Sequence, residues 1–506
     1  MTTRGAGLWL VVLVGAGLRF ATLGTQSLWF DETVTGQLLR MHLGEMLRAI
    51  PGSESTPPLY YVIAWLWTRV AGTGAVGLRS LSAVFGTATI VVAWALGRRL
   101  AGDRGGLAAA ALVAFNPLLI WFSQEARSYA LLALLGALAT LVWLRALEHG
   151  EGGRSARLAW GAIAAAALAT HYFAIFLVAP QAIWLVVAAP DLRRQAIAVA
   201  LPVAAGVALA PLAIVQQSDD RAAFIGTTAL STRLVHIPAQ FLVGYYTPLT
   251  ALAGALTVLV VVGGLAGLQR LVGARGAAPA AARADAVRVA VVAVSAVALP
   301  LIVAVAGKDY VLTRNVIAGL PLACVLLGAG LATFARRTSR RSRVGAAALA
   351  LACLAGTITT VSVASDPRRQ RDDWRDAARA LGPITGPRLI VVTPVQARSP
   401  LRYYLPNARV DTAQGPTYLT AEIDEISLPA RGDSQRAGSK PPRPRAPVAP
   451  AAGYALAGRT FGKTFTVLRW RAVSPRPAPI VPTRGLDGTD AALLTVDVRR
   501  APRPAS

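Results

Sequence analysis

Long apolar segments alternate with short polar loops over the first 364 residues of the chain. Segments long enough to cross about 30 Å of hydrocarbon occur near residues 6–23, 79–97, 105–121, 129–146, 158–170, 172–189, 194–215, 250–268, 288–306, 315–334 and 345–364. The segment at 158–170 is short and abuts its successor across His171, which leaves the count of these two open. The pattern predicts an all-α polytopic membrane domain at residues 1–364 with about eleven transmembrane helices.

Basic and acidic residues fall in alternate gaps between these segments. The basic gaps contain Arg4, 98–104, 145–157, 193–194, 270–288 and 336–343, and the acidic gaps contain 31–54, 125, 219–220 and 309. Because loops rich in Lys and Arg stay in the cytoplasm, we expect a cytoplasmic N-terminus and extracytoplasmic acidic gaps. A retained first span is favoured over a cleaved signal peptide, because no convincing small-residue cleavage site follows it.

The apolar stretch at 57–72, PPLYYVIAWLWTRVAG, does not fit this alternation as a full crossing. Counted as a span, it would place the basic loop at 98–104 outside, against the charge bias. Its Pro-Pro start is typical of a helix N-terminus, and its Tyr and Trp residues are typical of a membrane interface. We therefore expect a juxtamembrane helix or a re-entrant helix on the outer side, with an ordinary span as the alternative.

The composition changes after residue 365. The pattern predicts a helix at 372–381 and strands at 388–394 and 465–473. Residues 365–472 are thus expected to form a small extracytoplasmic α/β domain, which a Pro/Arg-rich linker at about 428–451 interrupts. The Pro-rich tail at 473–506 is expected to be disordered.

The composition agrees with a membrane protein, since 54% of the residues are hydrophobic and 15% are charged. The net charge of +26 could indicate nucleic-acid binding, but the Arg residues are scattered between apolar segments and no nucleic-acid motif accompanies them. The two cysteines lie within apolar segments, so they indicate neither a disulfide framework nor a thiol metal site. A Gly-rich phosphate loop, a Cys/His metal motif and a nucleophile elbow are also missing from the sequence, which argues against a cytosolic nucleotide substrate.

Charged residues that persist close to a membrane are candidates for function. Asp31 and Glu32 lie at the mouth of the first span, and repulsion between adjacent carboxylates could leave one as a usable general base beside a metal ligand or a substrate-orienting group. They could equally be solvated loop charges. Glu54 precedes the Pro-Pro pair and could join the same site or cap a helix.

A further group of polar residues lies in WFSQEARSYALL, residues 121–132. On a helix, Glu125 and Tyr129 would share one face. Arg127 could bind an anionic phosphate, pair with Glu125, or extend to a lipid headgroup.

Two weaker motifs lie in other outer loops. His171 and Tyr172 fall between two spans, where a histidine with apolar neighbours is more often structural than a ligand. Lys308 and Arg314 could attract phosphate or be ordinary loop charges.

The order of six segments resembles that of the GT-C fold membrane glycosyltransferases, including the rhizobial lipopolysaccharide glycosyltransferases, the aminoarabinose transferases and, more distantly, the protein O-mannosyltransferases. The resemblance covers roughly residues 6–335 and is strongest at 18–132. The segments are LRFATLGTQSLWFDE (18–32), TPPLYYVIAWLW (56–67), GLRSLSAVFGTATIVVAWALGRRLAG (77–102), NPLLIWFSQEARSYALL (116–132), THYFAIFLV (170–178) and RNVIAGLPL (314–322).

This resemblance implies a GT-C fold and the transfer of a sugar from a polyprenyl-phosphate donor to an envelope glycan, lipid or protein outside the membrane. It also implies that Asp31 is the catalytic carboxylate, with Glu32 orienting the acceptor or holding a divalent metal ion. Relatives often carry His or Lys before the Pro-Pro pair, whereas this chain has Thr56, which leaves the donor contacts and any metal site open.

The expected substrate-binding residues are Arg127, Glu125, Tyr129, Glu54, His171, Tyr172 and Arg314. A transporter or flippase of lipid-linked sugars is the main alternative, and a lipid-binding scaffold is another. The acidic groups gather at the outer ends of spans, whereas transporters usually place ionisable groups near the bilayer midplane. The sequence therefore favours an interfacial enzyme.

Overall fold

The structure, a computed structural model, describes two compact units. The helical unit comprises Met1–Leu23 and Leu38–Ser362, and the sheet unit comprises Gly24–Gln37 and Val363–Ser506. The described residues are 3–148, 151–187, 192–218, 223–248, 250–273, 279–334, 340–384, 386–411, 417–428, 443, 446–479, 492–497 and 499–500.

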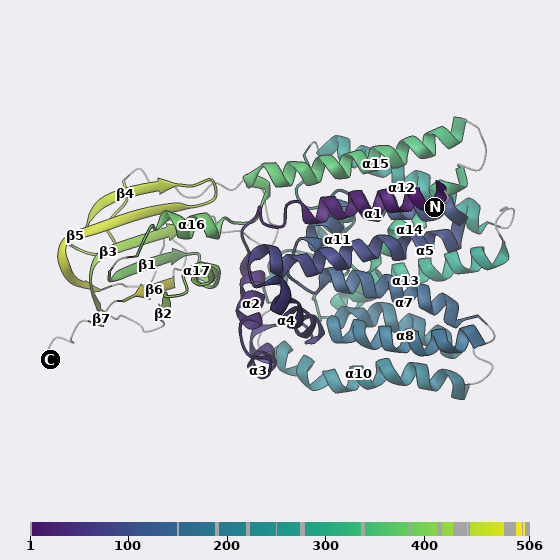
Figure 1. Ribbon diagram of the computed structural model, residues 1–506, viewed down its shortest axis with the longest axis horizontal. Helices are drawn as coiled ribbons and strands as arrows, with labels where there is room; N and C mark the ends of the chain where they lie inside the picture. Colours follow the sequence, from purple (N-terminus) through teal and green to yellow (C-terminus); the bar gives the residue numbers. More distant parts are fainter. Residues whose placement is uncertain are drawn as a thin grey trace. The chain divides into compact units, whose positions relative to one another are not determined.

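Long helices of the helical unit run alongside one another in Figure 1, and α3 and α4 lie at one end of the bundle. The helices are α1 (Thr3–Phe20), α3 (Leu43–Ser53), α4 (Leu59–Ala71), α5 (Ala75–Phe115), α6 (Pro117–Ser123), α7 (Tyr129–Ala146), α8 (Glu151–Thr170), α9 (Ile175–Val187), α10 (Leu192–Ser218), α11 (Leu230–Val243), α12 (Thr250–Val272), α13 (Ala280–Val305), α14 (Gly319–Phe334) and α15 (Arg340–Ser365). Two short 3-10 helices, η1 (Tyr172–Ala174) and η2 (Ala223–Thr227), complete the unit.

The predicted apolar segments coincide with these helices. Within the described residues, 5 helices are long and apolar enough to cross a membrane, and several shorter apolar helices accompany them. The longest, α5, covers one predicted span and most of the next, because non-helical backbone at Ala101 and Gly102 breaks it into two helices. Gly102 has a φ of 72°, a left-handed conformation that glycine adopts without strain.

The helix α4 corresponds to the apolar stretch that the sequence sets apart from the spans. It has 13 residues, and at 1.5 Å per residue it is about 20 Å long, short of the hydrocarbon thickness. Its tyrosines Tyr60 and Tyr61 are buried within the helical unit, whereas Trp65 donates a hydrogen bond to the carbonyl of Met41 at 3.0 Å. The helix is thus shorter than a full crossing, and its place as a juxtamembrane or re-entrant helix stays a prediction.

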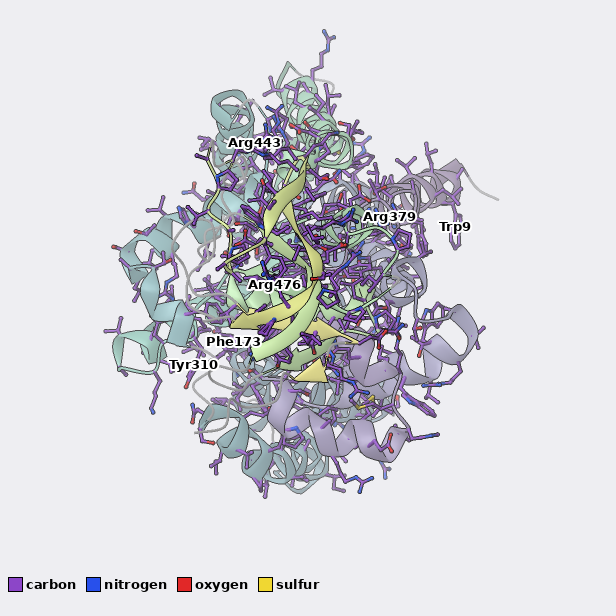
Figure 2. The ribbon with its side chains drawn as sticks, turned by 90° about the vertical axis from the view of Figure 1, so that its left-hand side faces the viewer. Trp9, Phe173, Tyr310, Arg379, Arg443 and Arg476 are labelled. Atoms are coloured by element: carbon purple, nitrogen blue, oxygen red, sulfur yellow. The ribbon has the colours of Figure 1, made fainter. Side chains whose placement is uncertain are left out.

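Apolar side chains cover much of the outside of the helices. On α1, Trp9 projects outward in Figure 2 and is 53% exposed, and Leu10 and Leu13 are also exposed. Where α12 and α14 meet, a Cβ added at Gly267 would lie 2.0 Å from the carbonyl oxygen of Gly330. Such close backbone contact between small residues is typical of helix packing in membranes.

The sheet unit contains a mixed sheet in the order β2-β6-β1-β3-β5-β4, and β7 also pairs with β3. The pair of β1 with β3 is parallel, and the other pairs are antiparallel. The elements of this unit are α2 (Phe30–Leu39, which ends in the helical unit), η3 (Pro367–Arg369), α16 (Trp374–Ala380), β1 (Arg388–Thr393), η4 (Val395–Ala397), α17 (Arg398–Tyr404), β2 (Arg409–Asp411), β3 (Thr417–Ser427), β4 (Ala455–Phe461), β5 (Thr466–Pro479), β6 (Ala492–Val496) and β7 (Arg499–Arg500).

The central strand β1 is apolar and buried on both faces. Ile390 and Val392 pack with Trp374 of α16 and Leu401 of α17, whereas Leu389 and its alternate neighbour Val391 pack on the opposite face. The predicted helix and both predicted strands are present, and β3, β4 and β6 are additional.

The predicted linker and tail only partly overlap the described residues. The strand β5 extends to Pro479, and β6 lies within the predicted tail and pairs with both β1 and β2. The prediction of disorder at 473–506 is therefore wrong for residues 473–479 and 492–496, because the short apolar run ALLTV completes the sheet core. Residues 429–442, 444–445 and most of the remaining tail lie outside the described residues.

A segment near the N-terminus belongs to the sheet unit, although the sequence predicts one domain for 1–364. Residues 24–37 are held by α16 and α17. The Arg375 side chain donates to the carbonyls of Gly24 and Thr25 at 3.0 and 2.9 Å, and the backbone N–H of Leu28 donates to Tyr404 Oη at 2.8 Å. These contacts join positions more than 300 residues apart in the sequence.

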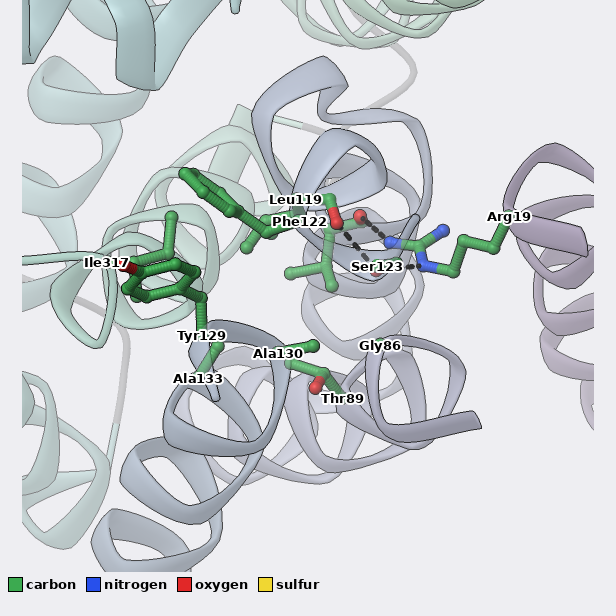
Figure 3. Close-up of a pocket in the computed structure, with 11 residues that line it drawn as sticks. Arg19, Gly86, Thr89, Leu119, Phe122, Ser123, Tyr129, Ala130, Ala133 and Ile317 are labelled. Atoms are coloured by element: carbon green, nitrogen blue, oxygen red, sulfur yellow. Dashed lines mark hydrogen bonds between the residues drawn. The ribbon is translucent and has the colours of Figure 1, made fainter. Parts of the chain in front are cut away.

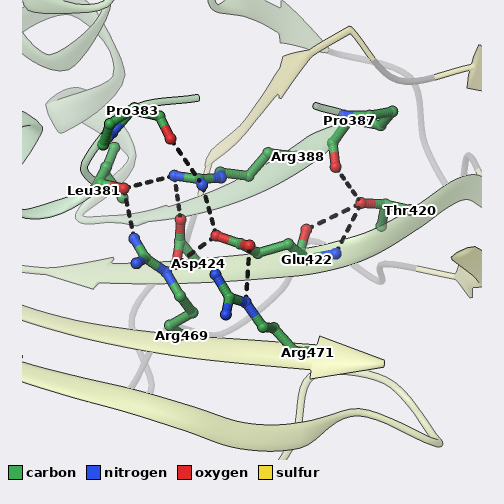
Figure 4. Close-up of polar contacts among 9 residues, drawn as sticks. All are labelled: Leu381, Pro383, Pro387, Arg388, Thr420, Glu422, Asp424, Arg469 and Arg471. Carbon is green, nitrogen blue, oxygen red and sulfur yellow. Dashed lines mark hydrogen bonds and ion pairs between the residues drawn. The ribbon is translucent and has the colours of Figure 1, made fainter. Parts of the chain in front are cut away.

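Charged side chains form a network across the strands of the sheet (Figure 4). Arg388 on β1 contacts Glu422 at 2.7 Å and Asp424 at 3.3 Å, both on β3. Arg469 on β5 pairs with Asp424 at 3.0 Å, and Arg471 pairs with Glu422 at 3.1 Å. Burial raises the pKa of Asp424, and Arg469 and Arg388 oppose this rise.

Candidate active site

The two adjacent carboxylates Asp31 and Glu32 lie in the first turn of α2, within the sheet unit. Glu32 is fully buried, accepts a hydrogen bond from the backbone N–H of Trp29 at 3.3 Å and lies 3.9 Å from the guanidinium of Arg371. Such a contact from the third residue of a helix back to its N-cap stabilises the helix start. Asp31 is partly exposed, and so it is the more accessible of the two.

Trp29, which precedes these carboxylates, also contacts Arg371. Arg371 lies over the ring of Trp29 at 5.7 Å, a cation–π contact. Arg371 thus contacts both Trp29 and Glu32, and it fixes the helix start that carries Asp31.

A buried ion pair lies in the helical unit, where Arg127 donates to Glu54 at 2.7 Å. Glu54 follows the end of α3, and Arg127 lies in the turn between α6 and α7. Their side chains are only 3% and 6% exposed. The guanidinium also lies 5.9 Å from the centre of the Tyr61 ring. Glu54 is therefore a close partner that orients Arg127.

The turn that carries Arg127 differs from the predicted helix. The helix α6 ends at Ser123 and α7 begins at Tyr129, so residues 124–128 form an irregular turn. The prediction that Glu125 and Tyr129 share a helix face is therefore wrong. The turn is anchored by Gln124, which donates to the carbonyl of Leu18 at 2.9 Å and to Thr22 Oγ1 at 2.8 Å. Glu125 is 1% exposed.

The histidine between α8 and α9 lies beside this turn. The ring of His171 is 5.9 Å from that of Tyr129. Burial is the main cause that lowers the pKa of His171, and the positive charges of Arg127 and Arg314 add to it. Together they bring the pKa to about 3. His171 therefore remains neutral at physiological pH. Its Nδ1 accepts the backbone N–H of Phe173 at 3.2 Å, which leaves the proton on Nε2.

Two tyrosines that the sequence does not single out complete this group. Tyr245 packs edge-on against Trp121 at 5.8 Å and against Phe122 at 6.0 Å, and Tyr246 lies 5.5 Å from Trp121. Burial raises the pKa of Tyr245, Arg314 opposes the rise, and Glu125 adds to it. The pair follows α11 in the short sequence GYYTP.

A glutamine that sequence reasoning also missed links the remaining residues. Tyr172 Oη donates to Gln216 Oε1 at 2.7 Å, and Gln216 Nε2 donates to the carbonyl of Thr56 at 3.2 Å. The Thr56 hydroxyl lies 3.0 Å from Tyr61 Oη. Thr56 thus has a structural partner where relatives often carry His or Lys.

Contacts link most of the predicted substrate-binding residues in the helical unit, and the charges of Glu125 and Arg314 act on this group, which we call the Arg127 cluster. Its members are Glu54, Glu125, Arg127, Tyr129, His171, Tyr172 and Arg314, together with Thr56, Tyr61, Gln216 and Tyr245. Asp31 and Glu32 belong to the sheet unit.

The described residues do not fit a divalent metal ion. Among them, no group of three or more His, Cys, Asp or Glu side chains is arranged to hold one. Glu54 is engaged by Arg127, and Glu32 caps its helix close to Arg371.

Arg19 is a second buried arginine of the helical unit, and its partners differ from those of Arg127 (Figure 3). Arg19 donates to the carbonyls of Ala114 and Val113 at 2.9 and 3.0 Å, and to Ser123 Oγ at 3.2 Å. These carbonyls lie in the last turn of α5, where a cation stabilises the unsatisfied end of the helix. Its partners explain the burial of Arg19 as a helix cap.

Comparison with known proteins finds a family match for part of the chain and solved structures that share its fold. Residues 55–216 match the family described as dolichyl-phosphate-mannose-protein mannosyltransferase. No curated protein sequence matches the chain. The matched segment includes Arg127, His171 and Tyr172.

Solved structures share the fold at low sequence identity. ArnT from Cupriavidus metallidurans bound to undecaprenyl phosphate is 15% identical with a TM-score of 0.56, over 92% of this chain and 98% of that chain. Its apo state is 14% identical with a TM-score of 0.53, over 80% and 85% of the two chains. An Archaeoglobus fulgidus oligosaccharyltransferase in complex with Zn and sulfate is 12% identical with a TM-score of 0.47, over 79% and 61%.

The family match and the shared fold confirm the resemblance drawn from the sequence. The expected multi-pass membrane location is likewise confirmed. Residues 55–216 are thus similar to a family of lipid-linked mannosyltransferases, and the chain shares the fold of ArnT.

Proposed function

We propose that this enzyme transfers a sugar from a polyprenyl-phosphate donor to a hydroxyl or amine of an envelope glycan, lipid or protein on the extracytoplasmic side of the cell membrane. The Arg127 cluster carries the proposal, because it gathers a buried, oriented guanidinium and a neutral histidine within the family-matched segment. The complex of ArnT with undecaprenyl phosphate lends support through the shared fold.

Arg127 is proposed to bind the donor phosphate. A guanidinium presents several N–H groups in a plane that matches phosphate oxygens, and Glu54 holds one of them at 2.7 Å. Because this pairing is already formed, the cation needs little reorganisation when charge develops on the departing phosphate. Arg314 is proposed to add a second positive charge, and His171 Nε2–H to donate a hydrogen bond.

Glu125, Tyr129 and Tyr172 are proposed to shape the donor site. Tyr129 packs on Phe122 with ring centres 5.0 Å apart, which gives the polyprenyl chain or the sugar an aromatic wall. Tyr172 is held by Gln216. We assign these residues to binding and positioning.

Asp31 is proposed to be the general base. It removes the proton from the acceptor hydroxyl or amine as this group attacks the anomeric carbon. The new bond forms from the acceptor atom to the anomeric carbon, and the bond from that carbon to the phosphate oxygen breaks. The polyprenyl phosphate leaves with the bonding electron pair. Glu32 is proposed to position the helix start through the contacts of Trp29 and Arg371.

Transfer by the purified full chain in liposomes tests this proposal directly. The liposomes contain a polyprenyl-phosphate sugar and receive crude envelope acceptors. We expect Asp31→Asn to lower the transfer rate by a factor of about 10² to 10⁴, the usual contribution of general base catalysis. Asp376→Asn is the matched control, because it removes a carboxylate that is 49% exposed in the same unit.

Two outcomes would contradict the proposal. Equal transfer by the wild type and Asp31→Asn would exclude Asp31 as the base. If lipid-linked sugar crossed the bilayer while no donor supported transfer, the chain would act as a transporter instead.

A further inference from the structure

A basic pocket lies beside Asp31 within the sheet unit, and neither the family match nor the expected site accounts for it. Its volume is about 340 Å³, close to the lower limit for small-molecule sites. Arg398, Ser399 and Arg402 of α17 line one side, and Phe30 and Gln37 of α2 line the other. Val395 and Val410 complete the wall.

The arginines of α17 give the pocket its positive charge. Arg398 and Arg402 are four residues apart and share a helix face, where like charges repel and destabilise the helix. Both side chains are exposed, and no described carboxylate forms an ion pair with either of them. From Pro394 to Val410 the chain contains three Arg residues and no acidic residue. An anion held by both guanidinium groups would remove this repulsion.

The opposite wall of the pocket belongs to α2, the helix that carries the proposed base Asp31. Phe30 and Gln37 are seven residues apart on α2, so they lie on the same face of that helix. Phe30 is 41% exposed and offers an apolar surface to a sugar ring or a lipid. Asp31 follows Phe30 directly, with the two Cα atoms about 3.8 Å apart. A molecule bound against Phe30 is therefore next to the turn that carries Asp31.

We propose that this pocket binds an anionic group, a phosphate or a carboxylate, on the acceptor of the reaction. The proposal rests on the proposed function, in which Asp31 deprotonates the acceptor. It narrows the acceptor to a molecule that carries a negative charge close to the hydroxyl or amine that receives the sugar. Arg398 and Arg402 bind the anion, and Phe30 and Gln37 contact the neighbouring part of the acceptor.

Binding of small anionic probes to the purified full chain tests the pocket without any donor. Glucose 6-phosphate and glucuronate are titrated by calorimetry, with glucose as the neutral probe. We expect the charged sugars to bind and glucose to bind at least tenfold more weakly. The double variant Arg398→Gln/Arg402→Gln should lose about tenfold or more in affinity for the charged probes. A stronger loss for one charged probe would identify phosphate or carboxylate as the preferred anion.

The matched control is Arg379→Gln, which removes an arginine from α16 in the same unit (Figure 2). Its side chain is 70% exposed and does not line the pocket. Unchanged binding by the double variant, equal loss in the control, or equal binding of glucose would each overturn the proposal.

Transfer assays separate a failure of the pocket from a failure of the proposed function. If Asp31→Asn abolishes transfer while the double variant binds and glycosylates as the wild type does, only the pocket assignment is wrong. If anion binding is lost in the double variant but Asp31→Asn transfers normally, the role of Asp31 is wrong, and so is the assignment of the bound anion to the acceptor.

Discussion

The Arg127 cluster and the charged network of the sheet are both rich in partly or fully buried charges, but their partners differ. In the sheet, Arg388, Glu422 and Asp424 pair across neighbouring strands, and each cation has a carboxylate of the same sheet. In the helical unit, Arg127 pairs with Glu54 at 2.7 Å, lies 5.9 Å from the centre of the Tyr61 ring and lowers the pKa of His171 by its charge. Burial of charge by itself therefore does not identify a site.

The origin of the charged residues separates the two regions further. The sheet network comes from regular strands in register, so cross-strand pairing accounts for its geometry. Most residues of the Arg127 cluster come from segments between the α-helices, at 54–56, 124–128, 171–172, 244–248 and 306–318, whereas Tyr61, Tyr129 and Gln216 lie in helices. Binding and catalytic residues concentrate on such connecting segments, because a rigid scaffold positions them there.

The largest effect is expected for Arg127. Arg127→Gln should lower sugar transfer by a factor of about 10² to 10³, as is usual when one group that stabilises developing charge is removed. It should also destabilise the helical unit by about 3–5 kcal/mol, because it leaves the buried carboxylate of Glu54 without its close cation. Transfer rates and thermal unfolding in detergent measure the two effects.

A second variant separates these two roles of Arg127. Glu54→Gln/Arg127→Gln removes both charges, so we expect it to recover most of the lost stability and none of the lost activity. If the double variant regained transfer as well, Arg127 would have a structural role only, as the arginines of the sheet network do.

A smaller effect is expected at the buried Arg19, which pairs with no carboxylate among the residues that the structure describes. An added Cβ at Gly86 would lie 1.9 Å from Ser123 Oγ and 3.0 Å from Arg19 Nε, so Gly86→Ala must displace the group that caps α5. We expect a loss of stability of about 1–3 kcal/mol, with the transfer rate of the folded fraction unchanged. Thermal unfolding and specific activity of the full chain are the measurements.

Gly17→Ala is the control for this prediction. No heavy atom lies within 4 Å of a Cβ at Gly17, and alanine favours a helix interior, so the variant should be neutral or slightly more stable. A large loss of specific activity in Gly86→Ala would show instead that the Arg19 cap belongs to the functional site.

The difference between the two units also explains what the sequence could predict. Long apolar periods predict the helices, and Arg127 and His171 could be proposed because polar groups close to a membrane are few. The pairing of Arg127 with Glu54 could not be predicted, because 73 positions separate the two residues in the sequence. Tyr245 and Gln216 were missed because each lies in a segment without a recognised motif.

The sheet unit was less predictable, because its elements depend on distant partners. Residues 24–37 look like an outer loop of the helical unit until the contacts of Arg375 and Tyr404 are known. The five-residue strand β6 lies in Pro-rich surroundings and becomes a strand through its pairing with β1 and β2. The local sequence pattern carries little information about the place of residues 24–37 or about strand β6.

The smallest effect concerns pH and the sheet. Burial raises the pKa of Glu425, and the hydrogen bond from Trp470 Nε1 at 2.7 Å opposes this rise. The pKa of Glu425 is higher in the folded state than in the unfolded state. Its carboxyl group therefore contributes most to stability when the pH is below the ordinary pKa of about 4. That contribution is lost as the pH rises through the raised pKa.

Glu425→Gln should therefore stabilise the sheet unit at neutral pH, since glutamine keeps an acceptor for Trp470 and has no charge to bury. The advantage over the wild type should disappear in acid. Glu422→Gln should have the opposite sign at neutral pH, because Glu422 is the partner of Arg388 and Arg471. Hydrogen exchange at β3 and β5, measured from acid to neutral pH, follows both variants. If the two variants behaved alike, charge pairing across strands would not account for the network, and its contrast with the Arg127 cluster would fail.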